Sequence, residues 1–375
     1  MSRITKKKKS REYSAFLSSI FAVCVGLFVG YLVMLVSNPS EANAGYAMIL
    51  MGPLTHGLKG VGQIFYYATP IILTGLSVGF AFRTGLFNIG ATGQFTMGAF
   101  GAVIIGITCT GLGGVHWVVA LLASIIFGAF WGFLPGIFKA FFNVNEVISS
   151  IMLNYIGMYL SNWVVKSSPI LFNKLRNESY EVAKTAQIPK WGLDKIFPGS
   201  SVHAGIIIAI IVVIIIYIIL EKTTFGFELK AVGFNKDASK YAGINEKRGI
   251  ILSMTIAGAV AGLAGGLVYL SASGKNIEIV DVLAAEGFTG ISVALLGVCH
   301  PFGILGAGIF IAFLYAGGYY LQLFNFSTEI IDIIISIIIY FSAFALIIKL
   351  LISKYRKMLE KKGVKEIKER KGGKK

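Results

Sequence analysis

Long apolar runs are the feature that most limits what this chain can fold into. The clearest run, residues 202–220, is built almost entirely from isoleucine and valine. A helix needs about 20 predominantly apolar residues to cross a bilayer. Because 55% of the 375 residues are hydrophobic, we expect most of the chain to lie within a membrane.

Windows of about 20 residues predict about ten transmembrane helices. The expected fold class is an all-α polytopic membrane protein in which some helices are broken or re-entrant. The predicted spans cover residues 14–36, 61–82, 88–107, 115–138, 146–165, 202–220, 249–272, 283–299, 303–321 and 329–351.

Both ends of the chain are strongly basic. Lys and Arg occupy six of residues 1–13 and eleven of residues 353–375. These two segments account for most of the net charge of +16. Cytoplasmic segments near spans are enriched in Lys and Arg, and such segments also attract anionic lipid. Nucleic-acid binding would call for interleaved aromatic residues, and the tails hold only Tyr13 and Tyr355. We therefore expect two cytosolic tails that contact membrane lipid and no nucleic acid.

Two cytosolic ends require an even number of spans, and ten satisfies this. The expected organisation is a transmembrane domain over residues 14–352 between the two tails. This orientation places a loop at 166–201 outside and a polar segment at 221–248 inside. The outer loop is rich in proline and reads as a small ordered cap.

No pattern of a metal, redox or nucleotide site is present in the sequence. The cysteines Cys24, Cys109 and Cys299 are far apart, and neither G-x-x-x-x-G-K-[ST] nor H-E-x-x-H occurs. We expect no metal, no cofactor and no enzymatic activity of the chain itself.

The polar segment 221–248 has the pattern of a folded element rather than a tether. Phe225, Leu229 and Val232 recur at helical spacing among six basic and four acidic residues. This predicts a short amphipathic helix with bends, lying on the membrane surface or against a partner. A solvated loop is the alternative.

Polar residues within the predicted spans are candidates for a solute path, because such residues tend to face a cavity or a partner. Asn88 and Gln94 lie in a glycine-rich stretch that should kink or break its helix. Capping of a bend is the alternative role for these amides. The remaining candidates are Asn145, Glu146, Asn154 and Glu286.

Glycines also recur every four residues in two predicted spans. One set is Gly128, Gly132 and Gly136, and the other is Gly258, Gly262 and Gly266. Each set puts small residues on one helix face, which predicts close helix packing rather than chemistry.

The order G-x-x-x-K-A-x-G-x-N-x-x-A-x-x-Y-A-G-I in the polar segment resembles the coupling loop of ABC-transporter permeases of the branched-chain amino acid, ribose and nucleoside importer group. In that family this loop docks on a cytosolic ATPase. The resemblance implies an ATPase-coupling loop formed by Gly226, Glu228, Lys230, Ala231, Gly233, Asn235, Ala238, Tyr241 and Gly243.

Further motifs carry the resemblance, among them the stretch 285–297, which is similar to a G-F-x-x-I-A-V-A-L-L-G segment of the family. The stretch F-N-I-G-A-T-G-Q at 87–94 is similar to a family signature, although Thr92 stands where Glu is frequent. The stretch N-E-V-I-S-S-I-M-L-N-Y-I at 145–156 looks like the nucleoside-permease branch. The resemblance covers roughly residues 65–345.

The implied function is that of a permease subunit of an ATP-driven importer in a bacterial plasma membrane. The implied partners are a cytosolic ABC ATPase, a second permease subunit and an extracellular lipid-anchored binding protein. Nucleosides are the expected solutes, and a monosaccharide or a branched-chain amino acid is the alternative. An ion-coupled secondary transporter would need a titratable residue at the bilayer midplane, but Glu286 and Asp332 both lie near predicted span ends.

Overall fold

The computed structural model describes residues 21–341 except 22, 273, 274, 325, 328 and 339, and these residues form two units. The smaller unit joins the two ends of the chain. Its described parts are the helix Val23–Ser37 and helical residues between 329 and 341. Gly26 and Gly30 let these two segments meet, because their bare backbones face Ile338 and Ile334. Both basic tails, and parts of the first and last predicted spans, lie outside the described residues.

The larger unit, Asn43–Thr328, carries the spans. Six described helices are long and apolar enough to cross a membrane. They are α3 (Gly57–Arg83), α4 (Ala91–Thr108), α5 (His116–Phe142) with the short 3-10 helix η1 (Thr110–Val115) before it, α8 (Gly205–Lys222), α11 (Glu246–Tyr269) and α13 (Pro301–Tyr319). The chain is therefore a helical membrane protein with several spans.

Two further helices fall below that threshold for different reasons. Helix α6 (Glu146–Ser167) has 22 residues but carries many polar ones. Helix α12 (Ala285–Leu296) has 12 residues, which is about 18 Å at 1.5 Å per residue and short of a bilayer core of about 30 Å. Residues 283–299, predicted as one span, therefore hold a helix that is too short to cross the bilayer by itself.

The predicted boundaries need correction at several places. The stretch 37–60 lies between two predicted spans, but it contains α2 (Ala42–Thr55), and α3 already begins at Gly57. A 20-residue window averages across the break at His56 and so hides a helix of 14 residues. Helix α8 starts at Gly205 and runs to Lys222, into the segment assigned to the inner loop.

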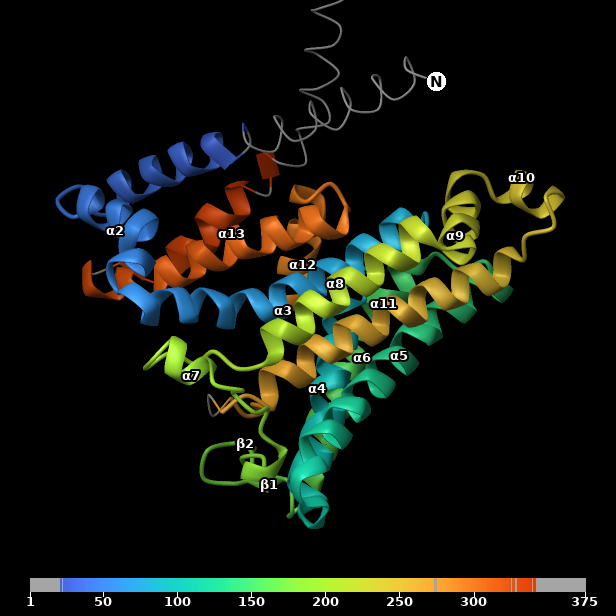
Figure 1. Ribbon diagram of the computed structural model, residues 1–375, viewed down its shortest axis with the longest axis horizontal. Helices are drawn as coiled ribbons and strands as arrows, with labels where there is room; N and C mark the ends of the chain where they lie inside the picture. The colour runs from blue at the N-terminus through green and yellow to red at the C-terminus, as the bar shows by residue number, and fades with distance from the viewer. Residues whose placement is uncertain are drawn as a thin grey trace, which may run out of the picture. The chain divides into compact units, whose positions relative to one another are not determined.

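The two glycine stripes pack against each other, and the predicted close packing is confirmed. Helices α5 and α11 lie side by side (Figure 1). A Cβ at Gly262 would lie 2.7 Å from the Cα of Gly128, and a Cβ at Gly132 would lie 2.9 Å from the Cα of Gly258. Backbone meets backbone along this seam, which only glycine permits.

Helices α3, α4 and α11 form the buried centre of the larger unit, whereas α5 and α8 expose more of their apolar surface. Helix α3 is also packed against α12 and α13. Because α3 is buried over most of its length, its polar residues must find partners inside the protein.

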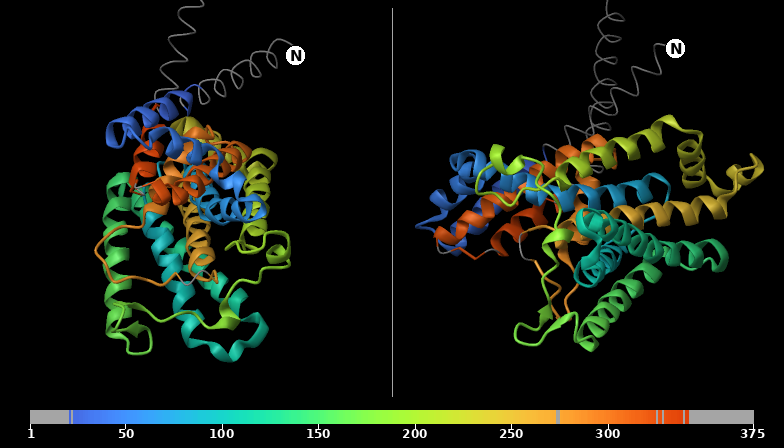
Figure 2. Two further views of the ribbon diagram at one scale, coloured as in Figure 1. Left: turned by 90° about the vertical axis from the view of Figure 1, so that its left-hand side faces the viewer. Right: turned by 60° about the horizontal axis from the view of Figure 1, so that its bottom comes forward.

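The segment 166–201 folds into a small ordered cap. It contains the hairpin β1 (Phe172–Asn173) and β2 (Glu178–Ser179), the 3-10 helix η2 (Lys184–Ala186) and α7 (Leu193–Ile196). Backbone hydrogen bonds from Ile188 to Leu270 and from Ala183 to Gly106 attach the cap to the C-terminal ends of α11 and α4. Figure 2 shows the hairpin at one end of this unit.

Helices α9 (Thr224–Phe234) and α10 (Lys236–Tyr241) occupy the other end (Figure 1). Leu229 and Val232 of α9 pack near Gly249, in the first turn of α11. The two ends of α11 therefore separate the cap from the α9–α10 pair. A final 3-10 helix, η3 (Tyr320–Phe324), follows α13.

Candidate functional site

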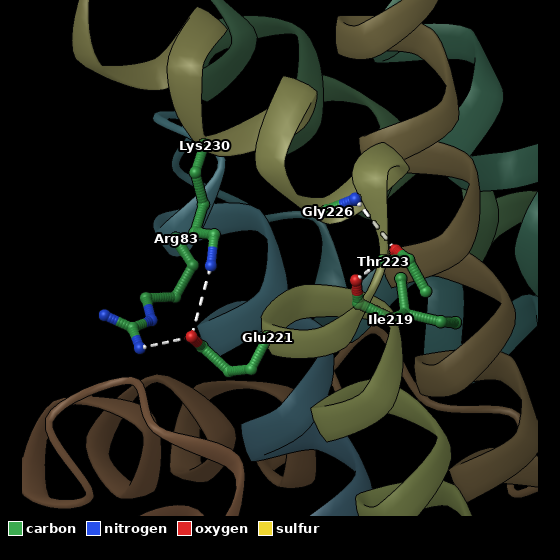
Figure 3. A network of polar contacts seen from close by, with 6 residues as sticks. All are labelled: Arg83, Ile219, Glu221, Thr223, Gly226 and Lys230. Atoms are coloured by element: carbon green, nitrogen blue, oxygen red, sulfur yellow. Dashed lines mark hydrogen bonds and ion pairs between the residues drawn. The ribbon is translucent and has the colours of Figure 1, made fainter.

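The segment predicted to be a bent amphipathic helix is the pair α9 and α10, and each helix begins at a side-chain cap. Thr223 Oγ1 accepts a hydrogen bond from the Gly226 N–H at 3.0 Å and donates one to the Ile219 carbonyl at 2.6 Å (Figure 3). Asn235 Oδ1 accepts from the Ala238 N–H at 2.9 Å. The chain therefore bends before each helix, because Thr223 caps the start of α9 and Asn235 caps the start of α10.

Glycines set the path of this pair. A Cβ at Gly226 would collide with the Ile219 carbonyl, so the sharp turn out of α8 requires glycine there. A Cβ at Gly233 would lie 2.6 Å from the carbonyl carbon of Thr84. Because glycine has no Cβ, α9 can pack directly against the turn after α3. Gly243 ends α10 with φ at 80°, a left-handed conformation that suits glycine.

A three-residue ion-pair network fastens α9 to the spans. Glu221, at the end of α8, lies 2.9 Å from the Arg83 guanidinium at the end of α3 and 3.2 Å from the Lys230 ammonium on α9 (Figure 3). All three side chains are partly buried, so water screens them less than it would a surface pair. A displacement of α9 would therefore be transmitted through these ion pairs to the ends of α3 and α8.

The solvent-exposed surface of the α9–α10 pair carries large aromatic residues. Phe227, Phe234 and Tyr241 are 68%, 90% and 95% exposed. Glu228 and Ala238 are also exposed, whereas Lys230 and Ala231 are half-buried. Exposed aromatic residues on polar helices are typical of a protein-binding surface.

Asn88 and Gln94 lie together in the centre of the protein. Asn88 Nδ2 donates to Gln94 Oε1 at 2.8 Å, and Gln94 Nε2 donates to Asn88 Oδ1 at 3.0 Å. Asn88 also donates to Ser77 of α3 at 3.1 Å. All three side chains are fully buried. In this conformation the two amides hold the break between α3 and α4, and contact with solute stays a prediction.

Asn154 of α6 joins the same region from another helix. Its Oδ1 accepts from the Gly93 N–H at 2.8 Å, and its Nδ2 donates to the Ile89 carbonyl at 3.1 Å. The hydroxyls of Thr92 and Ser150 are buried nearby and have no hydrogen-bond partner among the described residues. The start of α4 is therefore a polar centre with spare hydrogen-bonding capacity.

Asn145 and Glu146 do not join that centre. Asn145 caps α6 by accepting from the Val147 N–H at 2.9 Å, and Glu146 forms a 2.9 Å ion pair with Lys139 at the end of α5. Lys247, in the first turn of α11, lies over the ring of Phe141 in the last turn of α5 at 4.9 Å. These two candidates therefore lie at the α9–α10 end of the spans.

Glu286 lies at the cap end, in the first turn of α12. Its Oε1 accepts a 2.6 Å hydrogen bond from the Lys275 ammonium. Burial lowers the pKa of Lys275, but Glu286 and Tyr269 outweigh burial and raise the pKa overall, so the lysine stays charged. Lys275 and Tyr269 were not predicted as site residues, because a lone lysine in a short loop gives no pattern.

Comparison with known proteins gives one family and several relatives. Residues 60–343 match the branched-chain amino acid transport system / permease component family. The chain is 37% identical to the guanosine ABC transporter permease protein NupP of Bacillus subtilis, over 92% of this chain and 98% of the relative. It is 35% identical to the nucleoside ABC transporter permease protein NupB of Lactococcus lactis, over 89% and 92%.

A more distant relative is the glucose ABC transporter permease protein TsgB13 of Haloferax volcanii, which is 28% identical over 87% of both chains. No solved structure matches the chain.

Proposed function

The chain belongs to the family of branched-chain amino acid transport system permease components, and we propose that it is the membrane-spanning permease subunit of an ATP-driven ABC importer for nucleosides. Two relatives that span almost the whole chain are named as guanosine and nucleoside permeases. The stretch 145–156, which resembles the nucleoside branch, supports the same substrate class.

The α9–α10 pair carries the proposal, as the surface on which a cytosolic ATPase docks. Its exposed Phe227, Phe234 and Tyr241 suit an aromatic-rich interface. The ion pair of Lys230 with Glu221, which also pairs with Arg83, suits transmission, because it joins this surface to two spans. ATP binding and hydrolysis would move α9, and the ends of α3 and α8 would move with it.

The proposed orientation follows from charge. Cytosolic basic tails and about ten spans in a bacterial plasma membrane place α9 and α10 inside and the cap outside. The cap would then receive solute from an extracellular lipid-anchored binding protein. A second permease subunit would complete the pathway. ATP hydrolysis would take place in the partner ATPase rather than in this chain.

Uptake in cells that contain the complete transporter tests the proposal. Radiolabelled guanosine, glucose and leucine would be offered to cells with the wild-type chain and with Phe234→Ser plus Tyr241→Ser. The control is Tyr159→Ser, because Tyr159 is an exposed aromatic residue on α6, outside both the cap and the α9–α10 pair. Co-purification of the ATPase with each variant is the second measurement.

We expect guanosine uptake and ATPase co-purification to fall together in the α9–α10 variant and to stay normal in the control. Uptake of glucose instead of guanosine would overturn the substrate class and favour the second candidate, a glucose permease, which the relative in Haloferax volcanii supports. Full co-purification and uptake in the variant would overturn the docking role of α9 and α10.

A further inference from the structure

An ion pair ringed by tyrosines lies directly beneath the cap. Lys275 and Glu286 are joined at 2.6 Å, and the Lys275 ammonium lies 5.6 Å from the centroid of the Tyr269 ring. The two side chains are 42% and 24% exposed. Unlike the buried Asn88–Gln94 pair, this pair is therefore open to a solute.

Tyrosines from two more helices complete the cluster. Tyr66 and Tyr67 of α3 pack edge to face at 5.4 Å, and Tyr67 lies 6.4 Å from Tyr315 of α13. Tyr66 lies close enough to Lys275 to affect the pKa of its ammonium. Each of these four rings is partly exposed, although α3 and α11 are otherwise among the most buried helices.

The cluster lies between the cap and the polar centre. His203, just after the cap, packs against Tyr66 at 6.0 Å. On the other side, Tyr269 contacts Phe95 of α4 at 6.4 Å, and Phe95 follows Gln94 in sequence. Gly287, next to Glu286, is packed against Thr92 so closely that a Cβ would collide with it. The cluster therefore touches both the cap end and the start of α4.

The chemistry of the cluster fits a neutral solute with an aromatic ring. Lysine and glutamate together carry no net charge, so an ion gains little there. The ring faces of tyrosine stack on a nucleobase. A carboxylate accepts hydrogen bonds from N–H or O–H groups, and an ammonium donates to carbonyl oxygens or ring nitrogens.

We propose that Lys275, Glu286, Tyr66, Tyr67, Tyr269 and Tyr315 form the first nucleoside-binding site inside the permease. The base lies against the tyrosine rings, Glu286 accepts from its N–H groups or from ribose hydroxyls, and Lys275 donates to a base acceptor. This site rests on the proposed function, from which it takes its substrate class. A purely structural role explains the pair less well, because Lys275 is 42% exposed and ion pairs open to water contribute little to stability.

The test is the concentration dependence of guanosine uptake in cells with the complete transporter. Glu286→Gln keeps the shape of the side chain but removes its charge and half of its acceptor capacity. Loss of a hydrogen bond to a charged group should raise the KM for guanosine about tenfold or more. The maximal rate should change little, because the α9–α10 surface is intact.

Two controls match the change in chemistry but lie outside the cluster. Glu246→Gln removes a 3.7 Å ion pair at the opposite end of α11, and Tyr159→Leu removes an exposed ring on α6. Both should leave the KM unchanged. Tyr67→Leu, within the cluster, should raise the KM, and it keeps the test decisive if Glu286→Gln does not accumulate in the membrane.

The outcomes separate this proposal from the proposed function. Guanosine uptake with a wild-type KM in both Glu286→Gln and Tyr67→Leu would overturn the site and leave the nucleoside importer standing. An equal rise in KM in the controls would also overturn it, because the effect would then not belong to the cluster. A wild-type transporter that takes up no nucleoside would overturn the proposed function and this site with it.

Discussion

Gly262 shows at the scale of one residue how closely the spans are packed. A Cβ there would collide with the Ser124 carbonyl and lie 2.7 Å from the Cα of Gly128. Since backbone atoms cannot move aside as a flexible side chain can, Gly262→Ala should destabilise the protein by about 1–3 kcal/mol, the usual cost of overpacking. The midpoint of thermal unfolding in detergent measures this loss.

The matched control for that prediction is Gly306→Ala. Gly306 also lies within a helix, but a Cβ there meets nothing within 4 Å. Alanine is the better helix former by about 0.5–1 kcal/mol, so this variant should unfold at the same temperature or slightly higher. Equal losses in the two variants would contradict the close α5–α11 contact.

His203 predicts a dependence of stability on pH. Burial, followed by the charge of Lys190, lowers the pKa of His203 to about 4, and its Nδ1 accepts from the Gly205 N–H at 3.1 Å. In the unfolded chain the pKa is about 6.5. As the pH falls below that value, the unfolded chain binds a proton that the folded protein excludes. Stability should therefore fall by about 2 kcal/mol between about pH 8 and pH 5.

The variant His203→Asn isolates this effect, because asparagine keeps an acceptor for the Gly205 N–H but does not titrate. Thermal unfolding would be followed for both proteins over the same pH range. The variant should lose less stability on acidification than the wild type. A pH dependence identical in the two proteins would show that His203 is not the group responsible.

Single residues also show what the sequence could and could not predict. Asn88 and Gln94 stand out as amides at membrane depth, but nothing in their spacing indicates that they bond to each other. Asn145 and Glu146 were assigned to the same solute path, yet the structure puts them at the α9–α10 end. Hydropathy gives approximate depth, whereas partners depend on how helices are rotated against each other.

At the scale of elements, Glu221 connects α9 to α3 and α8. Glu221→Gln would remove both charge-assisted contacts and leave Arg83 and Lys230 without their shared carboxylate. Helix α9 should loosen, so its backbone amides should exchange hydrogen faster, and transport per ATP hydrolysed should fall. Hydrogen exchange over α9 and uptake with ATPase assays measure the two effects.

Glu246→Gln is the control for this change. Glu246 forms a longer ion pair of 3.7 Å with Lys236 of α10, and that pair does not reach α3 or α8. Its loss should leave the exchange of α9 and the coupling ratio close to wild type. If Glu221→Gln behaved like this control, the ion-pair network would have no part in transmission.

Elements differ in how well they could be predicted. The glycine stripes of α5 and α11 predicted tight packing, which is confirmed, but not that the two stripes face each other. The bend between α9 and α10 follows from Asn235, which is a good helix cap. Helices α2 and α12 are too short for a hydropathy window of about 20 residues to resolve.

At the scale of the whole larger unit, α11 separates two surfaces of different kinds. Its C-terminal end carries the cap and the tyrosine cluster, and its first turns meet α9. With 24 residues, the helix is about 36 Å long, which is enough to cross a bilayer core of about 30 Å. Solute capture and ATPase docking would therefore lie on opposite sides of the membrane.

Cysteine accessibility tests this arrangement and its direction together. Leu175 on the cap and Tyr241 on α10 are suitable positions, because both are almost fully exposed. Leu175→Cys and Tyr241→Cys would be introduced singly into a protein in which the accessible Cys24 and Cys109 are replaced by serine. If the basic tails hold the α9–α10 end in the cytosol, a membrane-impermeant maleimide should label Leu175→Cys in intact cells. Tyr241→Cys should react only after the membrane is permeabilised. The reverse pattern would invert the orientation, and labelling of both in intact cells would mean that α11 does not carry the two surfaces across the membrane.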